Sequence, residues 1–301
     1  MSSRKEMRVG MQVVEMKNKN IETGHEHSSK GNQLKWEQDG WWYKADAFGY
    51  ESLAETVVSE LISHSNISEY VVYEPVWMEY KGRVYRGCRS QNFKRPGEEI
   101  IPLERLHRSV TGVSLAKQLA RIGEVKERIQ YTEEVVRNAT GIENFGQYLA
   151  ILLEIDAFFL NEDRHTNNIA LLYNIETEEY RTCPVFDMGL SLFSDTREEY
   201  PLNLNFEECR KRIHAKPFHR DFDEQLDAVN ELYGSFLKFH LKAGELRKVI
   251  EKIEKEVRYE GESAEKERKQ TDLRMQGYLK QEIRRVEEIL HYQASKYQYL
   301  F

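Results

Sequence analysis

The sequence predicts an α+β fold of two lobes, a small β-rich lobe followed by a larger helical one. Strand-like aromatic and β-branched segments dominate the first hundred residues, and long helical repeats of apolar residues dominate the rest. Pro96-Gly97 separates the two regions and is typical of a turn or linker. We therefore expect residues 1–95 to form the first lobe and residues 96–301 the second.

Most of the first lobe is expected to be extended. Strands are predicted over residues 9–16, 40–47, 70–80 and 83–89. Lys81-Gly82 suits a hairpin turn between the last two. The polar segment 18–33 lacks periodicity and is expected to be a loop. One helix is predicted over residues 51–64, where apolar residues recur at helical spacing.

The second lobe is expected to be helical around one pair of strands. Helices are predicted over residues 113–138, 145–160, 222–242, 244–258 and 262–296. The helix at 145–160 is apolar over most of its surface, which indicates burial. A short loop at 161–168 leads to two strand-like segments, 169–173 and 180–186. Segment 188–220 follows them without periodicity.

The composition argues against several classes of protein. A net charge of −7 disfavours nucleic acid as a direct partner, because phosphate binding needs a basic surface. No apolar run is long enough to span a bilayer, and the N-terminal segment lacks the apolar core of a signal peptide. Cys88, Cys183 and Cys209 are too scattered for a disulfide framework or a zinc site. We therefore expect a cytoplasmic protein.

The strongest indication of chemistry is the polar loop that follows the helix at 145–160. Asp163, His165 and Asn168 lie on one predicted turn, and Asp187 follows at the end of an apolar strand. Phosphoryl transfer needs a carboxylate to orient the attacking hydroxyl, and an Asn–Asp pair to hold Mg²⁺ on the phosphates. The spacing from Asp163 to Asn168 equals that of the protein-kinase catalytic loop. Asp163 is thus the predicted base or orienting carboxylate, and Asn168 and Asp187 are the predicted metal ligands.

The pattern Asp163-Arg164-His165-x-x-Asn168, followed by Phe186-Asp187-x-Gly189, resembles the signature of the phosphatidylinositol 3/4-kinase-like superfamily. Within that superfamily the chain is most similar to the HipA-like serine/threonine kinases of bacteria. The resemblance implies a two-lobed protein-kinase-like fold with ATP and Mg²⁺ bound between the lobes. We expect a short form without the N-terminal HipA subdomain, because a phosphate-loop motif already begins at residue 28.

That motif is the segment SSKGNQLK, which is similar to the phosphate loop S-x-x-G-x-Q-x-K of HipA-like proteins. The resemblance implies that the loop covers the nucleotide phosphates through Ser28, Ser29, Gly31 and Gln33. In that family the leading serine can be autophosphorylated, which ejects the loop and silences the enzyme. Ser28 is the expected autophosphorylation site, with Ser29 as the alternative.

Lys44 lies on an expected strand of the first lobe, upstream of the helix at 51–64. From there it can point inward at the nucleotide phosphates, although lysines on strand edges also protect against aggregation. Glu55, at the border of the apolar stripe of that helix, is its expected acidic partner, and Glu51 is the alternative.

A further contact is expected with the nucleotide, and a contact with the substrate is left open. The adenine should lie against the connector between the lobes, near Gln91 and Phe93. A basic cluster in segment 188–220 either holds an acidic or phosphorylated substrate or is a solvated face. Its members are Arg210, Lys211, Arg212, Lys216 and Arg220.

Together these features indicate an ATP-dependent serine/threonine protein kinase of the HipA-like kind. His165 either stabilises the transferring phosphate or packs the loop, while the corresponding histidine of lipid kinases is proposed as the base. Two alternative functions stay open, a phosphoinositide or small-molecule kinase and a pseudokinase-like interaction module. The expected partners are a protein substrate and, by resemblance to toxin–antitoxin proteins, an antitoxin or another regulatory protein.

Overall fold

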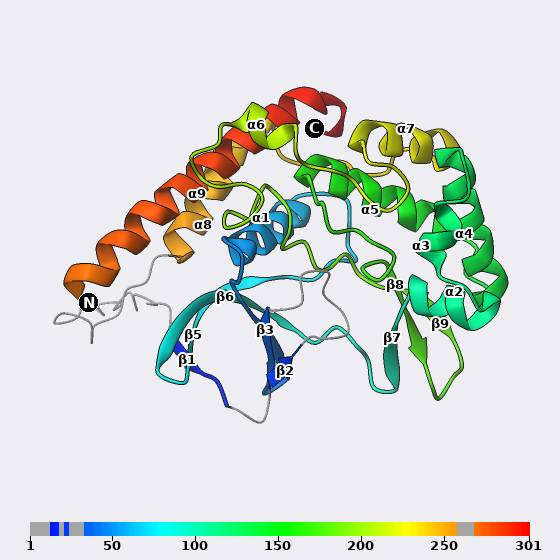
Figure 1. Ribbon diagram of the computed structural model, residues 1–301, viewed down its shortest axis with the longest axis horizontal. Helices are drawn as coiled ribbons and strands as arrows, with labels where there is room; N and C mark the ends of the chain where they lie inside the picture. The colour runs from blue at the N-terminus through cyan, green and yellow to red at the C-terminus, as the bar shows by residue number, and fades with distance from the viewer. Residues whose placement is uncertain (1–12, 18–20, 24–32, 258–267) are drawn as a thin grey trace, which may run out of the picture.

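The computed structural model describes residues 13–17, 21–23, 33–257 and 268–301. The chain has the predicted α+β fold of two lobes, in which a curled sheet lies below the helices in the view of Figure 1. The last strand of that sheet along the chain ends at Gln91, and the next strand, β7 (Glu98–Pro102), belongs to a second sheet. The predicted boundary at residues 95 and 96 falls between these two strands.

Six strands form the sheet of the smaller lobe, in the order β1-β5-β6-β4-β3-β2. Their bounds are β1 Val13–Glu15, β2 Ile21–Thr23, β3 Leu34–Gln38, β4 Trp41–Ala45, β5 Glu74–Tyr80 and β6 Arg83–Gln91. Neighbouring strands are antiparallel except β1 and β5, which are parallel. The predicted hairpin joins β5 to β6 at Lys81 and Gly82, whose φ angles of 52° and 70° are those that a two-residue hairpin turn requires.

Some strands of this sheet differ from the prediction. β2 lies in segment 18–33, where a loop is predicted, and β3 falls between predicted elements. Residues 9–12 of the predicted strand 9–16 lie outside the described residues. Trp36 of β3 is fully buried and packs edge-on against Tyr80 of β5, with ring centroids 5.5 Å apart. Such short strands form because of contacts that are distant in sequence, and a local pattern does not contain these contacts.

Helix α1 (Glu51–Ser63) confirms the predicted helix and connects the two lobes. Its apolar residues Leu53, Val57 and Leu61 belong to the main core, which is formed mostly by the larger lobe. The helix packs against β5 and β6 on one side and against α8 (Leu246–Val257) on another (Figure 1). Because α1 is buried on several sides, its polar residues are placed firmly between the lobes.

Four helices of the larger lobe precede the loop at 161–168, and only the last of them agrees with the prediction. They are α2 Leu103–Thr111, α3 Leu115–Leu119, α4 Val125–Thr140 and α5 Phe145–Phe159. The predicted helix at 113–138 is wrong, because Gly112 ends α2 with a φ of 76°, Ser114 caps α3, and Gly123 precedes α4. The helix predicted at 145–160 is confirmed as the buried helix α5.

The rest of the larger lobe surrounds a small sheet of order β7-β8-β9. The remaining elements are β8 Ala170–Asn174, β9 Tyr180–Thr182, α6 Phe206–Arg210, α7 Phe222–Tyr233, α8 Leu246–Val257 and α9 Arg268–Lys296. The helix predicted at 222–242 ends at Gly234, whose φ of 91° stops α7. α6 lies within the segment predicted to be irregular, and it begins with a capping box formed by Asn205 and Glu208. None of the helices in the described ranges is both long enough and apolar enough to cross a membrane.

Candidate active site

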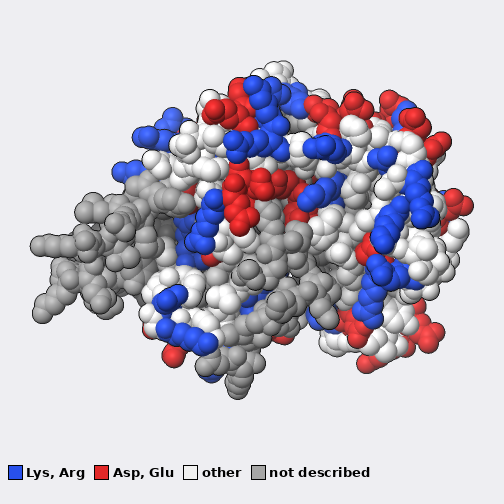
Figure 2. All heavy atoms as spheres, viewed as in Figure 1, with Lys and Arg blue, Asp and Glu red and all other residues white. Residues whose placement is uncertain are grey.

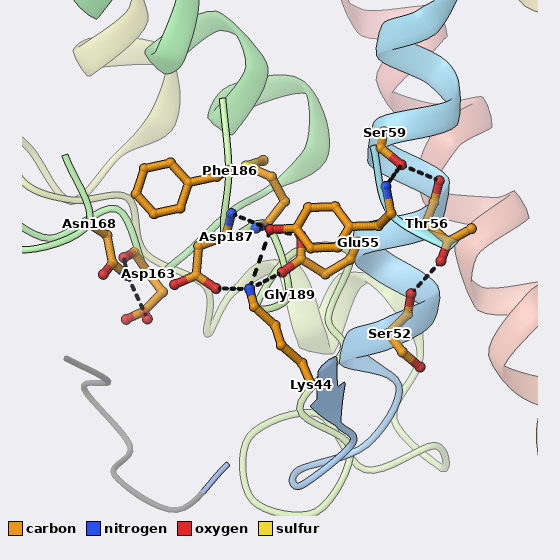
Figure 3. Close-up of polar contacts among 12 residues, drawn as sticks. Lys44, Ser52, Glu55, Thr56, Ser59, Asp163, Asn168, Phe186, Asp187 and Gly189 are labelled. Atoms are coloured by element: carbon orange, nitrogen blue, oxygen red, sulfur yellow. Dashed lines mark hydrogen bonds and ion pairs between the residues drawn. The ribbon is translucent and has the colours of Figure 1, made fainter. Parts of the chain in front are cut away.

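The candidate active site centres on Lys44 of β4, which points toward α1 and the segment after β9 (Figure 3). Its Nζ donates a hydrogen bond of 2.8 Å to Oε1 of Glu55 and one of 2.6 Å to Oδ1 of Asp187. The register of β4 against β6 fixes this direction, because Lys44 pairs with Cys88. The fold thus brings together three of the predicted site residues, one each from a strand, a helix and a loop.

Glu51, the alternative partner of Lys44, lies at the first position of α1 and makes other contacts. Its carboxylate accepts hydrogen bonds from the backbone N–H groups of Ala47, Phe48 and Gly49. It therefore ties the loop between β4 and α1 to the start of the helix. Glu55, one turn farther along α1, is the carboxylate that faces Lys44.

The second oxygen of Glu55 holds the segment that carries Asp187. The backbone N–H of Met188 donates to Oε2 of Glu55 at 2.9 Å, and the backbone N–H of Asp187 donates to the hydroxyl of Tyr73 at 3.3 Å. The ring of Tyr73 also lies against Lys44, with Nζ 5.1 Å from the ring centroid. Tyr73 is buried and was not among the predicted site residues, because nothing in its local sequence distinguishes it from an ordinary strand tyrosine.

Burial disfavours the charged forms of Lys44, Glu55 and Asp187. The attraction between the ammonium group and the two carboxylates opposes this effect on their pKa values. For Lys44, the carboxylates of Asp187 and Glu55 outweigh burial and hold the pKa well above its usual value. For Asp187, the ammonium group of Lys44 outweighs burial and lowers the pKa. Burial prevails for Glu55 and raises its pKa. The side chain of Asp187 is 26% exposed and that of Glu55 only 1%, so Asp187 is the carboxylate that a ligand can reach.

The backbone of Asp187 adopts a left-handed conformation, with a φ of 58°. Aspartate tolerates this region better than most residues, at a cost of about 1 kcal/mol or more. The hydrogen bonds from its own N–H group and from that of Met188 offset this cost. The strained conformation therefore belongs to the arrangement that directs the carboxylate of Asp187 at Lys44.

Arg164 determines the shape of the loop at 161–168 from inside the protein. Its guanidinium group forms a buried pair with Asp156 of α5, with Nε 2.8 Å from Oδ2 and Nη2 3.0 Å from Oδ1. It also donates to the backbone oxygen of Asn168 at 2.9 Å. Asn161 donates to the same Asp156 carboxylate at 2.7 Å. Asp156 was not predicted as part of the site, although an acidic residue in a mostly apolar, buried helix is a sign of such a buried partner.

Asp163 and Asn168 lie side by side on this loop (Figure 3). The Nδ2 group of Asn168 donates to the backbone oxygen of Asp163 at 2.8 Å and to its Oδ2 at 3.1 Å. This use of Nδ2 identifies Oδ1 as the atom of Asn168 that is available to a cation. The backbone N–H of Asp163 donates a hydrogen bond of 3.2 Å to Oδ1 of Asn161. The loop therefore presents one carboxylate and one carboxamide oxygen in a fixed relation.

His165 packs beside Asp163, with Nε2 3.8 Å from Oδ1 of that residue. Its Nδ1 accepts a hydrogen bond of 3.2 Å from the backbone N–H of Asn167. Burial lowers the pKa of His165, and the nearby Asp163 only partly opposes this. The imidazole is therefore neutral at neutral pH, as suits a residue that packs the loop or donates a hydrogen bond.

The other predicted nucleotide contacts are spread along the smaller lobe and the connector. Ser28, Ser29 and Gly31 lie outside the described residues, and Gln33 lies half-buried just before β3. Gln91 is exposed at the end of β6, where it pairs with Trp41. Phe93 is half-buried and packs against Phe186, with ring centroids 5.6 Å apart, so it contacts the residue that precedes Asp187.

The predicted basic cluster does not form one patch. Arg210 pairs with Glu207 at 2.8 Å, Arg212 donates to the backbone oxygen of Glu199, and Arg220 contacts His214. Figure 2 shows basic side chains over α6 with acidic side chains directly beside them. Lys216 differs from these, because its Nζ lies 3.6 Å from Oδ1 of Asp163.

No protein-family model matches the chain, and no curated protein matches its sequence. Among solved structures, the chain is similar to the proinflammatory kinase CtkA of Helicobacter pylori, with a TM-score of 0.57 and 14% identity over 95% of each chain. A second match is HipA of Shewanella oneidensis, from a complex with HipB and operator DNA. Here the TM-score is 0.37 and the identity 13%, over 89% of this chain and 62% of that one. The similarity to CtkA shows that the chain has a kinase-like fold.

Proposed function

We propose that the protein is an ATP-dependent kinase of HipA-like type that transfers the γ-phosphate of ATP to a serine or threonine hydroxyl of a protein. The observation that carries this proposal is the position of Lys44, which forms ion pairs with both Glu55 and Asp187 in a kinase-like fold. A lysine paired with a helix carboxylate, close to a carboxylate that can bind a metal, is the arrangement that protein kinases use to hold ATP. The loop with Asp163 and Asn168 supplies the remaining groups.

The oxygen atoms of this site fit Mg²⁺. Asp187, whose side chain is 26% exposed, binds Lys44 through Oδ1, so Oδ2 would be its oxygen for the ion, while Asn168 would offer Oδ1. Mg²⁺ takes hard oxygen ligands and binds through one or two protein groups together with substrate phosphates and water. Asp187 and Asn168 would therefore hold the ion, which when bound would neutralise the phosphate charges.

Each remaining residue has a role that follows from its contacts. Lys44, kept protonated by its two carboxylates, supplies a fixed positive charge for the nucleotide phosphates. Asp163, oriented by Asn168, accepts the hydrogen bond of the substrate hydroxyl and then its proton. Arg164 and Asp156 keep the loop in shape without contacting the substrate. Gln91 and Phe93 would lie at the adenine.

Incubation of the pure protein with radiolabelled ATP, with and without Mg²⁺, tests this proposal. We expect Mg²⁺-dependent labelling of the wild-type protein or of an added protein substrate. Asp163→Asn should lower the rate by about 10²–10⁴-fold, because it removes the general base. Asp227→Asn, an exposed aspartate on α7, is the matched control and should keep the wild-type rate. Normal labelling by Asp163→Asn would refute the proposed mechanism.

The same incubation separates the two alternative functions. Label that moves only to added lipid or to a small molecule would indicate a phosphoinositide or small-molecule kinase. An absence of label under every condition, from a folded protein, would indicate a pseudokinase-like interaction module. An antitoxin or another regulatory protein remains an expected partner only by the resemblance to HipA-like proteins.

Autophosphorylation on the phosphate loop is a further part of the proposal, and it rests on the resemblance of residues 28–35 alone. We expect mass spectrometry of the protein incubated with ATP to find phosphate on Ser28. Ser28→Ala should remove this phosphopeptide, and Ser29→Ala should keep it. An unchanged set of phosphorylated residues in Ser28→Ala would move the assignment to Ser29 or exclude the loop.

A further inference from the structure

Lys216 reaches the candidate catalytic carboxylate from a distant part of the chain. Its Nζ lies 3.6 Å from Oδ1 of Asp163, on the side of the carboxylate away from the Oδ2 atom that Asn168 contacts. We propose that Lys216 is a further catalytic residue, whose ammonium group stabilises the negative charge of the phosphoryl group as it passes to a hydroxyl held by Asp163. This inference rests on the proposed function.

The loop that carries Lys216 is anchored on both sides. Ala215 is buried, and its backbone N–H donates to the backbone oxygen of Arg220 at 2.8 Å, which closes the loop. Phe218 is fully buried in the main core. Lys216 therefore starts from a backbone whose position is fixed by its immediate neighbours.

The side chains of Gln225 and Arg128 hold the backbone of the same loop just after Lys216. The side chain of Gln225, 1% exposed, accepts hydrogen bonds from the backbone N–H groups of Phe218 and His219 at 2.9 and 3.2 Å. Arg128 of α4 donates to the backbone oxygen of Phe218 at 2.6 Å. A loop held by side chains of two different helices is preorganised, and preorganised charges stabilise a transition state without a cost of reorganisation.

The contact between Lys216 and Asp163 contributes little to stability. The side chain of Lys216 is 45% exposed, and such ion pairs contribute about 0–1 kcal/mol. At 3.6 Å the two atoms are too far apart for a short hydrogen bond, so the ammonium group keeps its donors for a third group. An exposed ammonium on a fixed loop beside the candidate catalytic carboxylate is suited to binding a ligand rather than to stabilising the fold.

The position of Lys216 also complements that of Lys44. Lys44 is bound between Glu55 and Asp187, on the side of the site formed by β4 and α1. Lys216 supplies positive charge on the side of Asp163, where the substrate hydroxyl would enter. Cations aimed at a transferring phosphoryl group act on the charge that develops at its oxygens.

The transfer forms one bond to the γ-phosphorus and breaks another. The hydroxyl oxygen forms a bond to the γ-phosphorus and gives its proton to Asp163. The bond between the γ-phosphorus and the β,γ-bridging oxygen breaks, and its electron pair leaves with ADP. Lys216 neither gives nor takes a proton, and its charge lowers the energy of the transition state.

Replacement of Lys216 by methionine removes the charge but keeps a side chain of similar length. For Lys216→Met we expect a fall in kcat of about 10²-fold with little change in the KM for ATP, because the charge acts mainly in the transition state. Lys216→Arg should recover part of the rate. Lys117→Met, an exposed lysine on α3, is the control and should behave as wild type.

The outcomes distinguish this inference from the proposed function. A kcat for Lys216→Met within about twofold of wild type would overturn the inference alone. A rise only in the KM for the protein substrate would also overturn it and assign Lys216 to substrate binding. A wild-type protein without any transfer would overturn the proposed function, and this inference with it. Thermal unfolding of each variant shows whether a loss of rate reflects a loss of fold.

Discussion

Glu282 of the C-terminal helix α9 and Arg86 of strand β6 form a bidentate ion pair, with Nη1 2.6 Å and Nη2 3.0 Å from the carboxylate oxygens. The Nε group of the same arginine donates to Asp46 at 2.6 Å. Asp46 in turn accepts hydrogen bonds from the backbone and the hydroxyl of Ser52, in the first turn of α1. A chain of charged contacts therefore connects α9 to the helix that carries Glu55.

Glu282→Gln should lower the free energy of unfolding by about 3 kcal/mol. The carboxylate is fully buried, and its loss leaves a mostly buried guanidinium with Asp46 as its remaining carboxylate partner. Urea unfolding measures the difference. Glu288→Gln changes an exposed position of the same helix and should shift the free energy by less than about 0.5 kcal/mol. Equal effects of the two changes would show that the pair does not hold α9 to the smaller lobe.

Gly87→Ala should displace β4 at Lys44 and lower both stability and transfer. A Cβ atom at Gly87 would lie 2.1 Å from the backbone oxygen of Lys44 and 2.2 Å from Cε of Met78, so the backbone must move. Overpacking of this kind costs about 1–3 kcal/mol. Gly123→Ala is the control, because a Cβ atom there meets nothing within 4 Å. Thermal unfolding and the labelling assay would contradict this prediction if Gly87→Ala and Gly123→Ala behaved alike.

The sequence was sufficient to predict the elements whose pattern is local. The helix at α1 follows from its apolar periodicity, and the β5–β6 hairpin follows from Lys81-Gly82. The short strands β2 and β3 and the breaks between α2, α3 and α4 depend on tertiary packing and on caps. These are the elements that the prediction missed or merged.

The residues of the candidate site also separate into those that local sequence predicts and those that only the fold brings together. The proximity of Lys44 to Glu55 follows from a strand that leads directly into a helix, and motif spacing indicated Asp187. Tyr73 could not be predicted, because its hydroxyl meets Asp187 only through the packing of distant segments. Lys216 appeared in the sequence as one of five cations, and only the fold distinguishes it by its contact with Asp163.

Stability should fall below pH 4.5 partly through Glu98 of β7. Hydrogen bonds from Arg181 and from the backbone of Arg95 lower the pKa of Glu98 from 4.5 to about 2. Because folding lowers this pKa, the contribution of Glu98 to the free energy of unfolding is complete above pH 4.5, the pKa of the unfolded state. It is lost as the pH falls toward 2. Solvent screening of the partly exposed Arg181 reduces the contribution to about 1–2 kcal/mol.

Unfolding by urea at several pH values between 2 and 6 measures this contribution. Glu98→Gln should be less stable than wild type at pH 6 and should lose less stability on acidification. Glu99→Gln, at the neighbouring exposed position, should follow the wild-type curve. A parallel decline of wild type and Glu98→Gln would assign the acid sensitivity to other carboxylates.

Lys44→Met should separate the structural role of the lysine from its catalytic role. The change leaves Glu55 and Asp187 without their shared cation, which should cost about 3–5 kcal/mol and abolish transfer. Adding Glu55→Gln removes the buried one of the two carboxylates and should restore part of the stability, because the two changes are coupled. Transfer should stay lost in the double variant, since the charge that faces the nucleotide phosphates is still absent. Urea unfolding and radiolabel transfer of both single variants and the double variant complete the cycle. Wild-type transfer by Lys44→Met would exclude Lys44 as the phosphate contact, whereas additive losses of stability would exclude the coupling between Lys44 and Glu55.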